Sequence, residues 1–580
     1  MLPILPLLAC CAPAQDPPLA SQGDPPALVV LVVCDQLIPE QLDRLSPWLD
    51  GGLARFWNKG RAYPKASLEY ALTETGPGHA TLSTGSLPSR HGIVGNLFFE
   101  RSLGKRIYCV GDSSSYALTT DGVVPSRAGS SAHRLKALTL AETLLRSDPE
   151  SRVFAVSMKD RSAILLSGPT PAWAVWWDRT SGGFMSSTHY GTELPAFVDQ
   201  WNRTWTNRAA AWEWTPSFDS DPSPLGTAED NRDGESPYGE QGIHFPYRLP
   251  GYNQAIADGD DRQAAAAQTK ALASALYGYP LGDQFTLEVA ARALVALDLG
   301  QDEHPDLLAV SLSSCDAVGH SFGPYSWEVT DTLLRTDKTL GQFLDLLDQG
   351  VGRGRWVAVL TSDHGVLELP EALQARGVGA KRIRIPEMGV FRGQVTRALE
   401  DVHGLRFKLG FDGRGLSFDP LEVAASGIDP AFLRRTLAEA CTKAHWVAEA
   451  YTLEELTSSD PAKSIGEDPW LDLYRASSFP GRNLDVVLRP DPWVLMSSGR
   501  GTSHGSPYPY DRRIPLAFLG APFPQGRSYE RAGSRDVLPT LLPLLGLKPL
   551  EPIDGRDLRE SPKARSESPP ADRQEASDSD

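Results

Sequence analysis

Residues 27–33 read ALVVLVV, and Cys34 and Asp35 follow directly. A continuous apolar run that is rich in valine predicts a strand buried on both faces, as the strands of a parallel sheet are. The run stops at Cys34 and Asp35, so a carboxylate is expected at the carboxyl end of this strand.

The same pattern returns further along the chain. The other runs are residues 152–156, 306–312, 355–360 and 513–519. Amphipathic helical patterns lie between them, for example at residues 136–146, 285–297 and 329–348. Strands that alternate with helices predict an α/β fold with a mostly parallel central sheet and helices on both faces. In such folds the reactive groups gather past the carboxyl ends of the strands.

Two regions interrupt this alternation and are interpreted as insertions that cap the site. The first holds seven of the fourteen tryptophans, and the second begins with a helical stretch. We therefore predict a signal peptide at 1–14, core segments at 27–170, 271–385 and 481–558, cap insertions at 171–270 and 386–480, and a polar, disordered tail at 559–580.

Composition excludes several classes of function. The net charge of −17 disfavours binding to nucleic acid, and an anionic substrate such as a small phosphorylated metabolite would need local cations. After the leader, no stretch reaches the ~18 apolar residues of a membrane helix. The six cysteines form no CxxC pair, so a zinc ribbon is not indicated. Nothing in the sequence fixes the oligomeric state, and we favour a monomer.

The first residues, MLPILPLLACCAPAQD, resemble a leader for export. Ala12-Pro13-Ala14 is typical of a signal-peptidase site, which predicts a periplasmic or secreted protein. Alternatively, residues 7–10 form a lipobox that would anchor the protein through Cys10. The missing positive charge leaves a third interpretation open, a misassigned start or a disordered tail.

The residues at the predicted strand ends form an inventory of metal ligands. They are Asp35, Asp316, His320, Asp363, His364 and His504. Oxygen and nitrogen donors of this kind suit Zn²⁺ and exclude a thiolate site. The spacing of Asp316 and His320 lets a loop or a first helical turn present both to one ion. A single histidine would normally be a satisfied polar residue, but the set at the strand ends favours a metal site.

Thr75 begins a glycine-rich turn, residues 75–79, ahead of a helical stretch. A hydroxyl at a helix N-terminus suits an oxyanion or phosphate, and a metal would make its alkoxide available. Taken alone, Thr75 is better explained as a simple N-cap. Residues 86–90, SLPSR, look like a sulfatase motif, but they follow Thr84-Gly85 instead of preceding it, so we interpret them as a loop after the helix.

Lys159 and Arg161 follow the strand at 152–156. Two residues apart on an extended segment, they would point the same way and could grip a dianionic phosphoryl group. The usual alternative is a pair of solvated charges.

Together these motifs resemble the PafA-type alkaline phosphatases, close relatives of the nucleotide pyrophosphatase/phosphodiesterases. The match extends from about residue 28 to residue 558 and comprises, in order, Asp35, residues 75–79, residues 84–93 with Asn96, residues 157–161, Asp316 with His320, residues 362–365 and residues 501–505. No single motif is specific, but the combined set is.

The resemblance implies two Zn²⁺ per chain, a fold and a mechanism. One zinc would be held by Asp316, His320 and His504. The other would be held by Asp35, Asp363, His364 and the Thr75 oxygen. Thr75 would form a phosphothreonine, while Asn96, Lys159 and Arg161 bind the non-bridging oxygens. The first zinc would stabilise the leaving alkoxide and then deliver hydroxide.

Lys159 and Arg161 favour a monoesterase, because a monoester carries more charge on its non-bridging oxygens than a diester. The tryptophans of the first cap keep a nucleotide-binding diesterase open, although packing in the cap core is their commoner role. A phosphomutase fits poorly, since those enzymes normally use serine, and a non-enzymatic binding protein is the remaining alternative. Cys34 and Cys315 each precede a proposed ligand, and a disulfide between them is a hypothesis.

Overall fold

The computed structural model describes residues 25–169, 172–218, 221–238, 241–251, 253–257, 261–458, 469–497 and 499–560. The predicted signal peptide, the lipobox at Cys10 and all but the first two residues of the predicted tail lie outside these residues. Among the described residues, no helix combines the length and the apolar character needed to cross a membrane.

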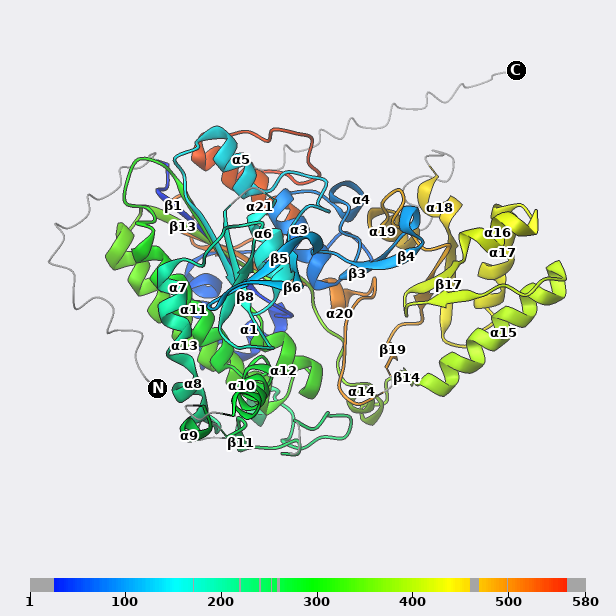
Figure 1. Cartoon of the computed structure of the whole chain (residues 1–580), viewed down its shortest axis with the longest axis horizontal. Helices are drawn as coiled ribbons and strands as arrows, with labels where there is room; N and C mark the ends of the chain where they lie inside the picture. Colours follow the sequence, from blue (N-terminus) through cyan, green and yellow to red (C-terminus); the bar gives the residue numbers. More distant parts are fainter. Residues whose placement is uncertain are drawn as a thin grey trace, which may run out of the picture.

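An 11-stranded sheet forms the centre of the molecule (Figure 1). Its order is β21-β2-β20-β13-β1-β12-β7-β8-β9-β5-β6. The five central strands run parallel: β13 (Trp356–Thr361), β1 (Leu28–Cys34), β12 (Asp306–Leu312), β7 (Val153–Ser157) and β8 (Trp173–Trp177). The flanking strands are β20 (Leu516–Leu519), β2 (Arg61–Ala62), β21 (Gly526–Arg527), β9 (Phe184–Ser187), β5 (Gly111–Thr119) and β6 (Gly122–Ser130). The predicted fold class is confirmed.

Strand β1 shows why the sheet needs helices on both faces. All seven of its residues are buried. Leu28, Val30 and Val32 join one hydrophobic cluster, whereas Val29, Leu31 and Val33 join another. The first cluster includes α11 (Leu281–Ala296), α12 (Ser314–Phe322) and α13 (Trp327–Leu347). The second includes α3 (Thr75–Thr84), α5 (Leu140–Ser147), α6 (Asp160–Ser167) and α21 (Val537–Leu541).

The final predicted strand differs from the expectation. It begins at Leu516, after Pro515, and β20 runs antiparallel to β13. The helix expected at 136–146 begins only at Leu140, because Thr139 caps it by accepting a hydrogen bond from the Glu142 amide.

The first expected insertion begins later than residue 171. Strands β8 and β9 lie in that range but belong to the large sheet. The remainder forms α7 (Ala196–Asn202), α8 (Trp205–Ala210), the small pair β10 (Glu213–Trp214) and β11 (Tyr247–Arg248), and α10 (Arg262–Leu276). Trp201, Trp205 and Trp214 are buried in the cluster around α11, so these tryptophans form core and not a stacking platform.

The second insertion is larger than 386–480 and contains its own sheet. Strands β15 (Leu409–Phe411), β16 (Gly415–Phe418), β18 (Val486–Pro490) and β17 (Val447–Thr452) pair in that order. With α15 (Ile385–His403) and α17 (Pro430–Cys441) they enclose a separate hydrophobic cluster and form the lobe at the right of Figure 1. Strand β18 pairs with β16 and β17, so the lobe extends past residue 480.

Candidate active site

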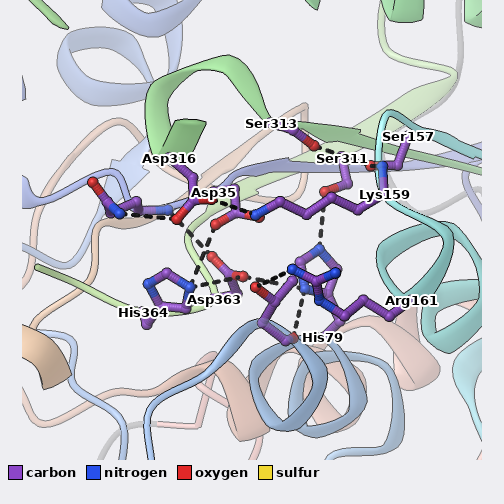
Figure 2. A network of polar contacts seen from close by, with 12 residues as sticks. Asp35, His79, Ser157, Lys159, Arg161, Ser311, Ser313, Asp316, Asp363 and His364 are labelled. Carbon is purple, nitrogen blue, oxygen red and sulfur yellow. Dashed lines mark hydrogen bonds and ion pairs between the residues drawn. The ribbon is translucent and has the colours of Figure 1, made fainter. Parts of the chain in front are cut away.

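The central parallel strands bring the predicted ligands together. Strands β13, β1 and β12 are neighbours in register, so their carboxyl ends lie at one edge of the sheet. Asp35 follows β1, Asp363 follows β13, and Asp316 lies in the first turn of α12, directly after β12. Figure 2 shows these three carboxylates facing one another.

A buried ligand group consists of Asp35, Asp363 and His364, whose exposed fractions are 0%, 1% and 0%. The Nε2 atom of His364 lies 3.4 Å from Asp35 Oδ1 and 3.4 Å from Asp363 Oδ2. None of these three atoms has a hydrogen-bond partner among the described residues. Unpaired polar atoms are costly in a protein interior, and here they converge on one another. This buried ligand group therefore fits a cation, and its donors suit zinc.

A second, more open ligand group consists of Asp316, His320 and His504. Asp316 Oδ1 lies 3.1 Å from His320 Nε2 and 3.9 Å from His504 Nε2. Asp316 and His320 stand four residues apart on α12 and so share one face of the helix. The ring of His504 stacks on that of His364 with centroids 3.5 Å apart, so His364 lies within reach of both groups.

All three histidines are oriented in the same way. Nδ1 of His320, His364 and His504 lies 2.8, 3.0 and 2.6 Å from the carbonyl oxygens of Thr502, Gly365 and Thr73, respectively. Because a carbonyl oxygen only accepts, each Nδ1 carries the proton. Each Nε2 is therefore left with a lone pair, which is the arrangement that metal-binding histidines adopt.

The charge at this edge of the sheet also favours cations. Burial, together with the neighbouring carboxylates of Asp316 and Asp363, raises the pKa of Asp35 to about 7. A bound divalent ion would reverse that effect by stabilising the ionised form.

Thr75 is the first residue of α3, and Glu74 is the N-cap. The alternative that Thr75 is itself the cap is therefore wrong. Its Oγ1 accepts a hydrogen bond from Arg161 Nη2 at 3.3 Å. Gly78, one turn along, explains the glycine-rich start of α3, because a Cβ there would lie 2.3 Å from the carbonyl oxygen of Asp363. The helix thus approaches the buried ligand group closely enough to present Thr75 to it.

Asn96 is tied to the start of the same helix. Its side-chain Oδ1 accepts a hydrogen bond from the Gly76 backbone N–H at 2.7 Å, and its backbone N–H donates to Glu74 Oε2 at 2.7 Å. With Oδ1 engaged, the side-chain NH₂ remains the donor that Asn96 can offer to a ligand.

Lys159 and Arg161 reach the site from the start of α6 and not from an extended segment. Lys159 is the N-cap and Arg161 lies in the first turn. The Lys159 ammonium, 3% exposed, donates to Asp35 Oδ2 at 2.5 Å and to Asp316 Oδ2 at 2.6 Å. It therefore bridges the two ligand groups, as Figure 2 shows, and the pair is not a set of solvated charges.

Several residues around the site were not anticipated. Gln36 donates through Nε2 to Asp316 Oδ1 at 2.8 Å, and its φ of 69° places it in the left-handed region. His79 lies between the Thr75 carbonyl and Ser311 Oγ, 2.9 Å from each. Asp283 accepts the amide hydrogens of Ser313 and Ser314 and so holds the start of α12. From the sequence, a role for Gln36 and His79 could have been inferred only because they lie close to Asp35 and Thr75 in the chain.

Two further expectations are settled by the structure. Cys34 and Cys315 are buried free thiols, so the proposed disulfide is wrong, and their hydrogen bond raises the pKa of Cys34. The sulfatase-like segment leads into the short helix α4 (Pro88–His91) after α3, and Arg90 in it pairs with Asp554. The segment therefore follows α3 as expected, but its residues from Pro88 onward are helical and do not form the expected loop.

Comparisons with known proteins agree with this geometry. The model of the type I phosphodiesterase / nucleotide pyrophosphatase family matches residues 29–383. The alkaline phosphatase PhoV of Synechococcus elongatus is 30% identical over 90% of this chain and 90% of its own. The alkaline phosphatase PafA of Elizabethkingia meningoseptica is 30% identical over 92% of this chain and 95% of its own.

A crystal structure of wild-type alkaline phosphatase PafA superposes with a TM-score of 0.81 at 28% identity, covering 92% of this chain and 98% of that one. The resemblance to PafA-type alkaline phosphatases is confirmed, as is the prediction of a phosphatase.

Proposed function

Because the chain belongs to the type I phosphodiesterase / nucleotide pyrophosphatase family, we propose that it hydrolyses phosphate monoesters of small metabolites through a phosphothreonine at Thr75. The observation that carries the proposal is the position of the Thr75 hydroxyl. It lies at the start of α3, within hydrogen-bond distance of Arg161, and Gly78 of the same helix closely approaches Asp363.

The chain would hold two zinc ions. Asp35, Asp363, His364 and the Thr75 oxygen would form one ligand set, and Asp316, His320 and His504 the other. The distances support assigning His364 to the first set, since its Nε2 is 3.4 Å from both buried carboxylates, whereas His320 is 3.1 Å from Asp316. When bound, the ions would supply Lewis-acid stabilisation of the attacking and leaving oxygens and lower the pKa of the threonine hydroxyl.

The chain's own residues would position the phosphoryl group. The Arg161 guanidinium is held between the Thr75 and Tyr108 hydroxyls, at 3.3 and 3.5 Å, and can grip two non-bridging oxygens. Lys159, whose ammonium donates to Asp35 and Asp316 in this structure, would add a second positive charge when those carboxylates bind zinc, and the NH₂ of Asn96 would add a neutral donor. The dipole of α3 favours negative charge at its first residue.

The reaction then proceeds in two displacements at phosphorus. The Thr75 hydroxyl loses its proton to solvent as the Oγ–P bond forms and the ester P–O bond breaks, and the leaving alkoxide takes up a proton from solvent. Water then cleaves the phosphothreonine, which releases inorganic phosphate and restores the hydroxyl. Phosphoryl transfer depends mainly on alignment and charge stabilisation, and the residues around Thr75 offer both.

A diesterase of the same family is the competing function. Lys159 and Arg161 argue against it, because a diester has less charge on its non-bridging oxygens. Trp201, Trp205 and Trp214 are buried in the core, which weakens the observation that had favoured a diesterase.

The test compares the turnover of p-nitrophenyl phosphate, a monoester, with that of bis-p-nitrophenyl phosphate, a diester. Both rates and the zinc content are measured for the wild type and for Thr75→Ala. We expect the monoester to be preferred, and Thr75→Ala to lose turnover while zinc is retained. Acid quenching of the wild type followed by mass spectrometry should find phosphate on Thr75. A Thr75→Ala variant with wild-type turnover would refute the nucleophile, and unchanged monoester turnover in Lys159→Ala and Arg161→Ala would refute the monoester preference.

A further inference from the structure

A cavity of about 1070 Å³ opens beside the candidate site. Arg161, Asp316 and His320 contribute to its wall from the site itself. The rest of the wall comes from the first insertion and the α10–α11 connection, and includes Arg179, Tyr238, Gln241, Arg248, Tyr277 and Tyr279. Thr75, Asp35 and Asp363 are not part of this wall, so the cavity adjoins the open ligand group and not the nucleophile.

This placement assigns the cavity a role in the proposed reaction. An in-line displacement puts the leaving group on the side of phosphorus opposite the attacking oxygen. With Thr75 on the side of the buried ligand group, the leaving group must point toward Asp316 and His320, and therefore into the cavity. A monoester has only this one substituent, so the cavity alone would select among substrates.

We propose that the cavity is a leaving-group subsite that favours monoesters of aromatic alcohols carrying a second anionic group. The proposal rests on the proposed function, since it needs Thr75 to be the nucleophile and a monoester to be the substrate.

The aromatic part of the proposal rests on three tyrosines. Tyr238 and Tyr279 pack with ring centroids 5.1 Å apart, and Tyr277 lines the same cavity. Tyr277 also shares the cavity wall with Arg161, one of the phosphoryl-binding cations. A flat leaving group could thus lie against a tyrosine ring while its phosphate reaches Arg161.

The anionic part rests on Arg179. This exposed side chain holds its guanidinium 4.5 Å from the centroid of the Tyr277 ring and donates to Ser274 Oγ at 3.4 Å. Within the described residues it forms no ion pair, whereas Arg248 on the same cavity is paired with Glu213 at 2.8 Å. Arg179 therefore offers its charge to a ligand, in a chain whose net charge of −17 otherwise repels anions.

The experiment compares phenyl phosphate with 4-carboxyphenyl phosphate in the wild type, Arg179→Gln and the control Arg203→Gln. Arg203 is also in the first insertion, but its side chain is 65% exposed, pairs with Asp199 and is not part of the cavity wall. The ratio of kcat/KM for the two substrates is read in each protein, so differences in intrinsic leaving-group reactivity cancel between variants. We expect Arg179→Gln to lower the carboxyphenyl-to-phenyl ratio roughly 10-fold, the usual effect of losing a charge-assisted hydrogen bond, and Arg203→Gln to leave it unchanged.

A second pair of substrates tests the tyrosine wall. Tyr277→Leu should lower the ratio of phenyl phosphate to ethyl phosphate, because the leucine cannot stack on a ring. Calorimetric titration of both aryl phosphates into Thr75→Ala, with and without Arg179→Gln, gives the same comparison from binding alone.

The outcomes separate the two proposals. A wild type that turns over neither aryl phosphate refutes the proposed function, and the subsite with it. A wild type that turns over both, with a carboxyphenyl-to-phenyl ratio that Arg179→Gln does not change, refutes the subsite and leaves the phosphatase intact.

Discussion

The two ligand groups are built from different parts of the fold. The buried group follows the central strands β1 and β13, and none of its three side chains is more than 1% exposed. The open group comes from α12 and from the loop at 501–505, and the His320 side chain is 35% exposed and lines the cavity. In the proposed mechanism, the sheet would fix the side from which Thr75 attacks, whereas a helix and a loop would form the side from which the leaving group departs.

This difference has an energetic meaning. In the buried group, polar atoms that lack a partner cannot form hydrogen bonds to water instead. Removing one ligand therefore leaves the other two buried without compensation. In the open group, water can replace the His320 side chain, which is 35% exposed, whereas the side chains of Asp316 and His504 are only 5% and 7% exposed. The proposed reaction would depend on both groups, which Lys159 links by donating hydrogen bonds to Asp35 and Asp316.

The largest effect should come from the buried group. Asp363→Asn removes a charge from three converging ligands, and we expect monoester turnover to fall on the order of 10³-fold, the upper range for losing one group that stabilises transition-state charge. Bound zinc, measured by elemental analysis, should fall by about one ion per chain.

The matched control is Asp306→Asn. Asp306 is equally buried, but it lies at the amino end of β12, where it accepts the amides of Arg152 and Gly300, far along the strand from the site. The Asp306→Asn variant should bind as much zinc as the wild type and turn over the monoester at the same rate. If Asp363→Asn retained both, the buried group would not be a metal site.

A smaller effect is expected in the open group. His320→Ala should lower turnover by ~10–100-fold, the range found when a metal site is weakened without being destroyed. Because water can occupy the vacated position, added zinc should restore part of the activity. Rates measured across a zinc titration check this. A loss as large as that of Asp363→Asn, with no recovery, would show that the two groups are equivalent.

The acidic members of both ligand groups can be predicted from the sequence. Parallel strands buried on both faces leave continuous apolar runs, so β1, β12 and β13 and the acidic residues after them can be found from composition alone. The ligand Asp316 and its neighbour His320 are predicted by their helical spacing. Gln36 and Asp283 are not, because each acts through contacts with residues distant in sequence.

Long-range pairing also explains the errors at the insertions. Strand β18 completes a sheet with β16, which lies about seventy residues earlier, and no local pattern encodes that partnership. Lys159 and Arg161 were expected on an extended segment, yet Lys159 caps α6 without a side-chain hydrogen bond. Both side chains contact the candidate site, but the local geometry differs from the expected one.

The smallest effect should come from Arg414. This residue of the second insertion supports the start of α3, where Thr75 lies. Its Nη1 donates to Glu74 Oε1 at 3.3 Å, and it also bonds to the Leu97 carbonyl. Glu74 in turn holds the Asn96 amide next to Thr75. Arg414→Met should lower kcat roughly 10-fold, below the 10²-fold that a misplacement of about 1 Å can cause.

A double-mutant cycle distinguishes the effect of the Arg414–Glu74 contact from a general stabilisation of the lobe. Glu74→Gln and Arg414→Met should be non-additive in kcat, because both break one chain of contacts to Asn96. The control Arg397→Met, on the exposed side of α15 in the same lobe, should leave kcat unchanged. Strict additivity would mean that the second insertion does not act on the nucleophile through Glu74, and the rigidity of the attacking side would then come from the sheet alone.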